Sequence, residues 1–188
     1  MHIRMHVCFL DSLDLSRNLL TGSLPSSLRS RLTRLSSFRL SHNFLNGKVH
    51  GVDDAKKSKL DLSSNFLTGT SPEEIWILNS LEILNFSSNV LMSNFPNGTS
   101  PGNHLATLDL AENSWTGSTP LDFGNLSNLT SLGLSTNYPN ILTLQNTWEL
   151  LLSMAKLESL DLSGNAIEFF PTQLNNLTNL EDLNLSYN

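Results

Sequence analysis

The stretch Leu105–Pro120 reads LATLDLAENSWTGSTP, and much of the remaining chain repeats it with small changes. Its centre is the frame Leu-x-Leu-x-x-Asn, carried here by Leu108, Leu110 and Asn113. Related frames occur on both sides, and the asparagines that close them are Asn18, Asn43, Asn65, Asn89, Asn113, Asn137, Asn165 and Asn188. Successive asparagines are 25, 22, 24, 24, 24, 28 and 23 residues apart, a period that predicts a solenoid of about eight stacked repeats.

The spacing of the frame has a mechanical reason. Two leucines two positions apart describe a short strand that turns alternate side chains into a core. One such strand cannot bury its apolar side alone, whereas stacked copies pair as a parallel sheet and share one continuous core. The asparagine stands where the chain leaves the strand, and a buried amide there can bond backbone groups that the turn leaves unpaired. We therefore interpret the eight asparagines as a structural ladder.

A second motif, Leu-Thr-Gly-x-x-Pro or a variant of it, follows the asparagine in several copies, for example from Leu20 to Pro25 and from Leu67 to Pro72. Glycine permits backbone conformations closed to other residues, and proline stiffens the next corner. Together the two motifs resemble the plant-specific class of leucine-rich repeats. This class occurs in the ectodomains of plant receptor-like kinases and receptor-like proteins, and in polygalacturonase-inhibiting proteins. The resemblance covers Leu10 to Asn188.

The resemblance implies an α/β fold, a right-handed curved horseshoe with a parallel β-sheet on its concave face and loops and short 3-10 or helical turns on its convex face. We expect residues 10–188 to form one leucine-rich repeat domain, truncated at its C-terminal end, after an irregular start without a cap over residues 1–9. The 28-residue interval places extra residues within 138–147. Insertions in solenoids collect in loops on one side, often the binding side.

Composition narrows the classes of function. The chain has 188 residues, of which 39% are hydrophobic and 15% are charged, enough apolar material for a core. A net charge of -6 argues against a nucleic-acid partner, which requires a basic face. The single cysteine, Cys8, excludes an intrachain disulfide. No stretch resembles a signal peptide or approaches the roughly 18 apolar residues of a membrane span. We expect an internal fragment or a truncated gene product.

The solvent-facing strand positions repeat an aspartate or asparagine row and a serine row. A repeated surface holds little information for distinguishing ligands, so the departures from it are better candidates, and arginine and aromatic residues are frequent interface anchors. Lys59, with Lys56 and Lys57, fits either a local irregularity or a basic contact patch. Trp115 stands where a leucine normally packs, so we interpret it as core. The candidate ligand contacts are Arg39 and His42 at expected strand positions, Lys59, Ile83, Asp109, Glu112 and Tyr138.

Catalytic and metal chemistry find no support in the sequence. The aspartates are spread along a ladder without a repeated His or Cys partner, and neither a phosphate loop nor a metal-ligand spacing is present. His2, His6 and Cys8 lie close in sequence, but an unstructured start explains them better than a metal site. We therefore expect no enzyme, no cofactor and no metal. Of six Asn-x-Ser/Thr sequons, the candidate N-glycosylation sites on the outer wall are Asn125, Asn128 and Asn176.

The resemblance implies a protein- or peptide-recognition module from the extracellular region of a plant receptor-like kinase or receptor-like protein. Such a module acts in signalling or defence at the outer face of the plasma membrane or in the cell wall, with a peptide or protein ligand and a co-receptor as partners. Any kinase domain of the parent protein would lie outside this chain. Two alternatives stay open: a secreted protein similar to polygalacturonase inhibitors, and a non-functional truncated gene product.

Overall fold

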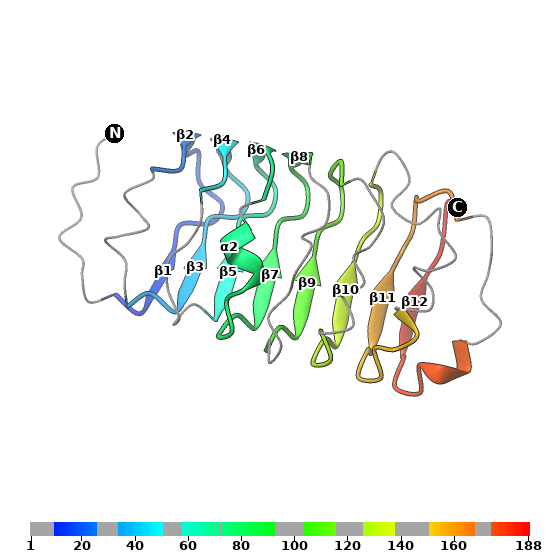
Figure 1. Cartoon of the computed structure of the whole chain (residues 1–188). Helices are drawn as coiled ribbons and strands as arrows, with labels where there is room; N and C mark the ends of the chain where they lie inside the picture. Colours follow the sequence, from blue (N-terminus) through cyan, green and yellow to red (C-terminus); the bar gives the residue numbers. More distant parts are fainter. Residues whose placement is uncertain are drawn as a thin grey trace.

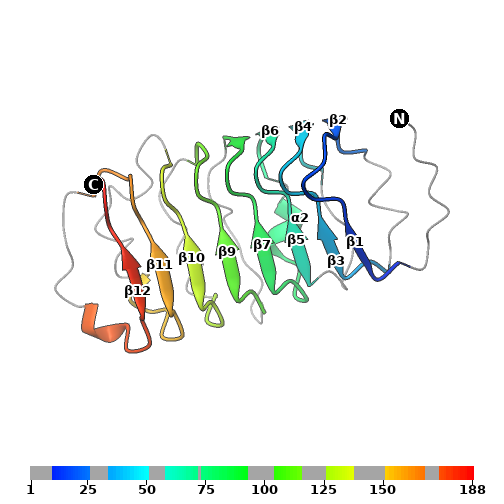
Figure 2. The same cartoon turned by 180° about the vertical axis from the view of Figure 1, so that it is seen from behind.

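The computed structural model describes residues 10–25, 34–50, 58–71, 73–92, 104–115, 126–137, 151–167 and 174–188. Eight of the described strands form one parallel sheet in the order β1-β3-β5-β7-β9-β10-β11-β12 (Figures 1 and 2). Equivalent frame positions stand opposite one another, as Leu13 does with Phe38 and Leu132 with Leu160. The predicted leucine-rich repeat solenoid with a parallel sheet is therefore confirmed. The strands are β1 (Ser12–Asp14), β3 (Ser37–Arg39), β5 (Lys59–Asp61), β7 (Ile83–Asn85), β9 (Thr107–Asp109), β10 (Ser131–Gly133), β11 (Ser159–Asp161) and β12 (Asp182–Asn184).

A second parallel sheet, which the sequence interpretation did not include, lies beside the first in the N-terminal half (Figure 1). Its strands follow the order β2-β4-β6-β8 and contain the Leu-Thr-Gly motif or its variants. Gly47 and Gly69 within them have φ angles of 76° and 82°, a conformation that side chains disfavour. The glycine of the motif is thus required by the backbone path. The strands are β2 (Thr21–Ser23), β4 (Phe44–Lys48), β6 (Phe66–Gly69) and β8 (Val90–Leu91).

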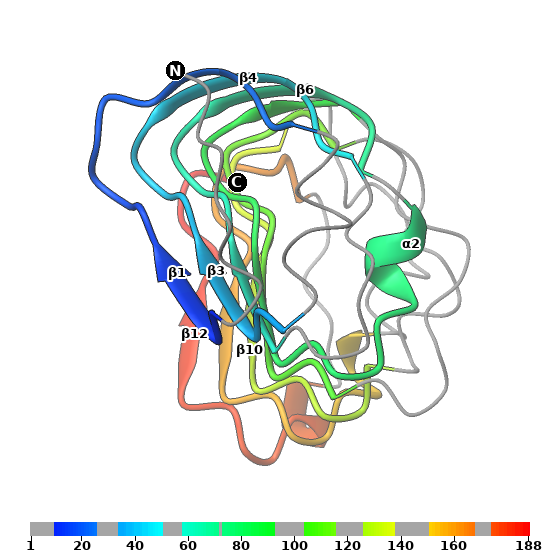
Figure 3. The same ribbon diagram turned by 90° about the vertical axis from the view of Figure 1, so that its left-hand side faces the viewer.

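The described helical segments are short: α2 (Glu73–Trp76) and the 3-10 turn η2 (Leu174–Asn176). Helix α2 lies on the side of the molecule away from the eight-stranded sheet (Figure 3). It buries Trp76, whose indole N–H donates to Ser71 Oγ at 3.1 Å. The Trp76 ring meets Trp115 edge to face, with centroids 6.2 Å apart, and Trp115 is fully buried. The interpretation of Trp115 as a core residue is therefore confirmed.

The core is a column of frame leucines that runs through all the copies. Leu60, Leu84 and Leu108 are 1%, 0% and 0% exposed, and each packs between equivalents in neighbouring copies. Burying a leucine side chain contributes about 2 kcal/mol, so this column is the main source of cohesion. Leu183 of β12 is 37% exposed, because β12 pairs with a described strand on one side only.

The ladder asparagines join each copy to the one before it. The side-chain amide of Asn65 donates to the carbonyl oxygens of Leu40 in the preceding copy and Leu62 in its own, at 3.0 and 3.2 Å. Its Oδ1 accepts the backbone N–H of Leu45 at 3.0 Å. Asn43, Asn89 and Asn113 make the equivalent bonds. One buried amide thus satisfies several backbone groups that the turn would leave unpaired.

The ladder changes at the 28-residue interval. Oδ1 of Asn165 accepts the backbone N–H of Asn137 at 3.3 Å, whereas the corresponding oxygen in earlier copies accepts from the residue two positions after the asparagine. Two positions after Asn137 the sequence has Pro139, which carries no backbone N–H. The proline therefore explains why the usual bond is absent at this interval. At the next interval, Oδ1 of Asn188 accepts both the backbone N–H of Asn165 at 2.9 Å and that of Ile167 at 3.2 Å.

Candidate ligand-binding surface

The open face is the side of the eight-stranded sheet that is turned away from the leucine core, and it carries four rows of side chains. Two rows come from the first and third residues of each strand, a third from the residue two positions beyond the strand, and an edge row from the residue before each ladder asparagine. From β1 to β12 the rows are Ser12, Ser37, Lys59, Ile83, Thr107, Ser131, Ser159 and Asp182; Asp14, Arg39, Asp61, Asn85, Asp109, Gly133, Asp161 and Asn184; Ser16, Ser41, Ser63, Ser87, Ala111, Ser135, Ser163 and Ser186; and Arg17, His42, Ser64, Ser88, Glu112, Thr136, Gly164 and Tyr187.

In most copies the second-row side chain accepts hydrogen bonds from the turn that follows the strand. Oδ1 of Asp61 accepts the backbone N–H and the hydroxyl of Ser63 at 3.1 and 2.7 Å. Oδ1 of Asn85 makes the same two bonds with Ser87 at 2.9 and 2.7 Å. Carboxylate and amide serve equally because each offers the same acceptor atom. This row is therefore scaffold wherever the pattern holds, and it departs from the pattern at Arg39 and Gly133.

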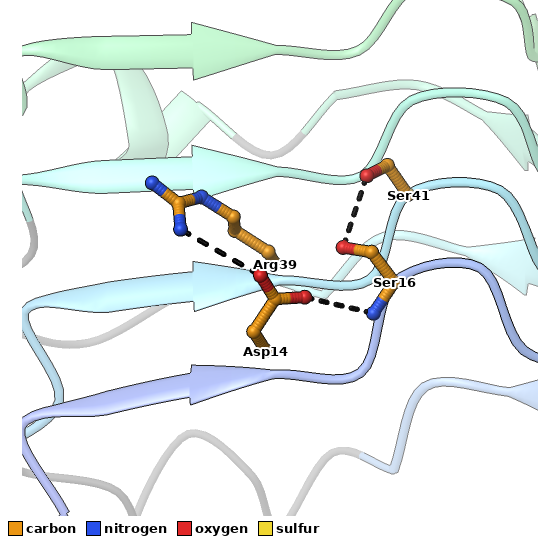
Figure 4. A network of polar contacts seen from close by, with 4 residues as sticks. All are labelled: Asp14, Ser16, Arg39 and Ser41. Carbon is orange, nitrogen blue, oxygen red and sulfur yellow. Dashed lines mark hydrogen bonds and ion pairs between the residues drawn. The ribbon is translucent and has the colours of Figure 1, made fainter.

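Arg39 replaces the acceptor of the second copy. Its Nη1 lies 3.6 Å from Oδ2 of Asp14 on the neighbouring strand, and the two side chains are 42% and 51% exposed (Figure 4). Exposed ion pairs contribute at most about 1 kcal/mol, so Arg39 is free to exchange Asp14 for a carboxylate of a ligand. The pKa of Asp14 is lowered, first by the hydrogen bonds from Ser16 and to a smaller extent by the charge of Arg39.

Asp109 occupies the same row in a different environment. Its neighbours across the sheet are Asn85 and Gly133, and a Cβ on Gly133 would meet Oδ1 of Asp109 at 2.6 Å. The carboxylate of Asp109 thus lies against the backbone of Gly133, in the space that a side chain at position 133 would occupy. Burial raises the pKa of Asp109, the hydrogen bonds from Ala111 and Ser87 partly offset this rise, and the charges of Asp161 and Glu112 add to it.

The edge row has a left-handed backbone in every copy. Its seven non-glycine members have φ angles between 48° and 60°, and Gly164 has 66°. His42 belongs to this row, so its predicted position within a strand is wrong: β3 ends at Arg39, and His42 lies exposed in the turn with φ 55°. The strand is only three residues long because the turn to the ladder asparagine begins at once. Glu112, also in this row, accepts the hydroxyl hydrogen of Ser88 at 2.6 Å.

The remaining predicted residues have different positions. Lys59 and Ile83 begin β5 and β7, are half-buried, and stand opposite one another across the two strands. Asn128 is half-buried, and its Oδ1 accepts from Nζ of Lys156 at 2.8 Å. Asn176 is exposed at the end of η2. Tyr138 and Asn125 lie outside the described residues, as does all of the predicted insertion within 138–147. The sheet therefore brings Arg39, Lys59 and Ile83 together on successive strands.

An exposed apolar stripe escaped the sequence interpretation. It consists of the residue after the ladder asparagine in the first four copies, Leu19, Phe44, Phe66 and Val90, which are 82%, 47%, 53% and 47% exposed. The rings of Phe44 and Phe66 stack with their centroids 6.1 Å apart. The signal in the sequence was the apolar residue that directly follows the ladder asparagine in each of these copies.

The described residues contain no group of three or more His, Cys, Asp or Glu side chains placed to hold a metal ion. Their helices are also too short and too polar to cross a membrane.

A sequence profile of the Leucine Rich Repeat family matches residues 9–30, 58–78, 104–126 and 156–177, which contain the first, third, fifth and seventh copies. The chain therefore carries leucine-rich repeats. Receptor-like protein 35 of Arabidopsis thaliana is 35% identical to it over 87 residues, which are 46% of this chain and 9% of the relative.

Solved structures of plant receptors share the fold. A crystal structure of a TDR receptor superposes with a TM-score of 0.83 at 26% identity, covering 95% of this chain and 31% of the receptor chain. The ectodomain of the Arabidopsis receptor kinase HAESA, solved in complex with an N-terminally extended IDA peptide hormone, gives 0.79 at 27% identity, covering 93% and 30%. The chain thus spans only part of the length of these receptors, and the predicted resemblance to plant receptor ectodomains is confirmed.

Proposed function

We propose that this chain is a protein- or peptide-recognition module that binds its ligand along the open face. The observation that carries the proposal is that every residue of the first two rows is half-buried or exposed. Parallel sheets are normally covered on both faces. A parallel sheet with one accessible face can therefore bind a ligand on that face. The eight strands form this surface without interruption.

The chemistry of the face suits a polypeptide ligand. It combines positive, negative, hydroxyl and apolar side chains on a surface many residues long, and arginine is a frequent anchor of interfaces. The residues that we assign to ligand contact are Arg39, His42, Lys59, Ile83, Asp109, Glu112 and Tyr138. The similarity to HAESA, which was solved with a peptide hormone, supports this class of ligand.

The wider setting follows from the same relatives. We infer that the parent protein is a receptor-like protein with this module outside the cell, that residues 10–188 form one domain after an irregular start over residues 1–9, and that a co-receptor joins the complex. Signalling or defence and attachment to a membrane are part of this proposal. So is N-glycosylation at Asn125, Asn128 and Asn176. The similarity to Receptor-like protein 35 supports the assignment.

A peptide library displayed on phage tests the proposed binding. Peptides selected on the wild-type chain are measured again on a double variant, Thr107→Trp with Ser131→Trp, which adds bulk to two adjacent positions of the open face. The matched control, Glu74→Trp, adds the same side chain at an exposed position of α2, away from the sheet. We expect the face variant to weaken the selected peptides at least tenfold and the control to leave them unchanged.

The opposite pattern would overturn the proposal. If the selected peptides bind the face variant as well as the wild type, or lose binding to the α2 control instead, the open face is not the recognition surface. Circular dichroism of both variants separates loss of binding from loss of fold, because a folded variant retains the wild-type spectrum and thermal transition.

A further inference from the structure

The charged side chains of the open face are sorted by sign along the sheet. Copies one to three contribute three basic and two acidic side chains: Arg17, Arg39, Lys59, Asp14 and Asp61. Copies five to eight contribute four acidic side chains: Asp109, Glu112, Asp161 and Asp182. All four rows lie within the described residues, and in copies five to eight they contain no basic side chain. Copy four separates the two groups with Ile83, Asn85, Ser87 and Ser88, none of which is charged.

The fold does not require the negative charges. Asn85 and Asn184 hold the same turns through a neutral amide, accepting the backbone N–H of Ser87 and Ser186 at 2.9 and 3.1 Å. Asp161 accepts the equivalent bond at 2.9 Å with a charge that the turn does not need. Like charges close together on a sheet destabilise it. The negative charges of the open face are therefore not explained by the stability of the fold. A ligand with positive charges would explain them.

The acidic half can hold a basic side chain between two carboxylates. Asp109 and Asp161 are the strand neighbours of Gly133 on either side, and the Asp109 carboxylate leans over that glycine toward the strand of Asp161. A guanidinium placed there would neutralise both carboxylates, and charge-assisted hydrogen bonds of this kind are among the strongest that proteins make.

We propose that the open face binds an extended peptide segment with separated charges, its acidic residues over copies two and three and its basic residues over copies five to seven. This inference rests on the proposed function and specifies the chemistry of its ligand. Complementary charges of both signs fix the direction in which a peptide lies, which a face of one sign could not do.

The sheet sets the spacing of those charges. Arg39 and Asp109 are three strands apart, about 14 Å at the usual spacing between strands. Arg39 and Asp161 are five strands apart, about 24 Å. An extended peptide that runs across the strands advances about 3.3 Å per residue, so its opposite charges lie about four to seven residues apart.

Labelled synthetic peptides of equal composition test the arrangement. The block peptide has two glutamates at one end, two arginines at the other and four Gly or Ser residues between them, and it is made in both directions with capped termini. The control peptide alternates the same four charges. Fluorescence anisotropy at low ionic strength gives the dissociation constants. We expect one direction of the block peptide to bind at least tenfold tighter than the control peptide, with the advantage decreasing as salt is added.

Matched variants locate the effect. Asp109→Asn with Asp161→Asn removes two charges and retains the Oδ1 acceptors, and we expect it to weaken the block peptide about tenfold. Glu73→Gln with Glu74→Gln changes the net charge by the same amount on α2 and should have no effect. Equal binding of block and alternating peptides, or equal losses in the two double variants, would overturn the inference.

The phage experiment distinguishes this failure from failure of the proposed function. If the selected peptides depend on Thr107 and Ser131 but the block peptides show no advantage, the open face binds peptides without sorting their charges. If the selected peptides are indifferent to the open face, both proposals fail.

Discussion

The first four copies and the last four copies share one sheet, but within the described residues only the first four add a second one. Each of the first four has a strand in the eight-stranded sheet and another in the four-stranded sheet, whereas the described strands of copies five to eight belong to the larger sheet. In a solenoid, stability is close to a sum of contacts between neighbouring copies. We therefore expect the second sheet to slow local opening in the N-terminal half.

The position four residues beyond each ladder asparagine varies along the chain. The first three copies have glycine there, which accepts the positive φ seen at Gly47 and Gly69. The fourth copy, which contributes β8, has Ser93, and the fifth has Gly117. Glycine at this position therefore does not by itself separate the copies that have a strand in the second sheet from those that have none described.

The largest expected effect comes from removing a buried ladder amide in the two-sheet half. Asn65→Ala leaves the carbonyls of Leu40 and Leu62 and the N–H of Leu45 without their partner, so we expect the free energy of unfolding to fall by about 3 kcal/mol. Urea denaturation measures this loss. Hydrogen exchange at the Leu45 amide should accelerate with it.

The matched control is the exposed first rung of the ladder. Asn18 donates to the carbonyls of Leu15 and Ser16 in its own copy, so Asn18→Ala should lower the free energy of unfolding by less than about 1 kcal/mol. Equal losses in the two variants would contradict a ladder whose strength comes from bonds between buried neighbouring copies.

The main sheet could be predicted from sequence because the leucine frame reports directly on burial. A leucine two positions from another leucine specifies a strand, and its recurrence specifies the register in which Leu84 faces Leu108. The second sheet could not be predicted in the same way. Residues such as Thr21 and Asn46 face solvent there, so no alternation of apolar and polar side chains marks the strands.

The candidate site was predicted less completely than the fold. The alternation rule placed Arg39, Lys59 and Ile83 on the open face, but it extended the strand too far and included His42 in it. The sequence also did not predict which groups surround each charged side chain. That the Asp109 carboxylate leans over Gly133 depends on which copies are neighbours and how their side chains pack, and neither is visible in the frame itself.

A smaller effect is expected at the glycines of the second sheet. Gly47→Ala forces a side chain into φ 76° and brings its Cβ within 3.2 Å of Ser23 Cβ, so we expect a loss of about 1–2 kcal/mol in the free energy of unfolding. Hydrogen exchange should accelerate in β4 and leave β10 and β11 unchanged. Equal acceleration in β10 would show that the two halves of the solenoid are not distinct.

Gly22→Ala separates the two causes of that loss. Gly22 has φ 90°, and a Cβ there would meet nothing within 4 Å. This variant therefore has the backbone strain without the close contact, and it should lose less stability than Gly47→Ala. A greater loss at Gly22 would mean that the approach of neighbouring strands is not what confines position 47 to glycine.

The smallest expected effect compares two carboxylates of one row. The pKa of Asp14 is lowered, so the folded state binds its proton more weakly than the unfolded chain does, and the stability that it contributes is present at neutral pH and lost in acid. The pKa of Asp109 is raised, so its ionised form destabilises the fold at neutral pH and the free energy of unfolding rises as the carboxyl is protonated. The two halves of the face should therefore respond to neutralisation with opposite signs.

Asp14→Asn and Asp109→Asn measure those signs, since asparagine already serves this row at position 85. At pH 7 the first variant should be slightly less stable than the wild type and the second slightly more stable. As the pH falls, the difference at Asp109 should disappear first, because its raised pKa lets it take up a proton earlier, and the difference at Asp14 should disappear only in stronger acid. Urea titrations across that range follow the free energy of unfolding. A stabilisation by Asp109→Asn that persists at pH 3 would come from packing rather than charge. A loss of stability at pH 7 would mean that Asp109 is compensated by groups other than those that raise its pKa, and the negative half of the face would then no longer need a ligand to explain its charges.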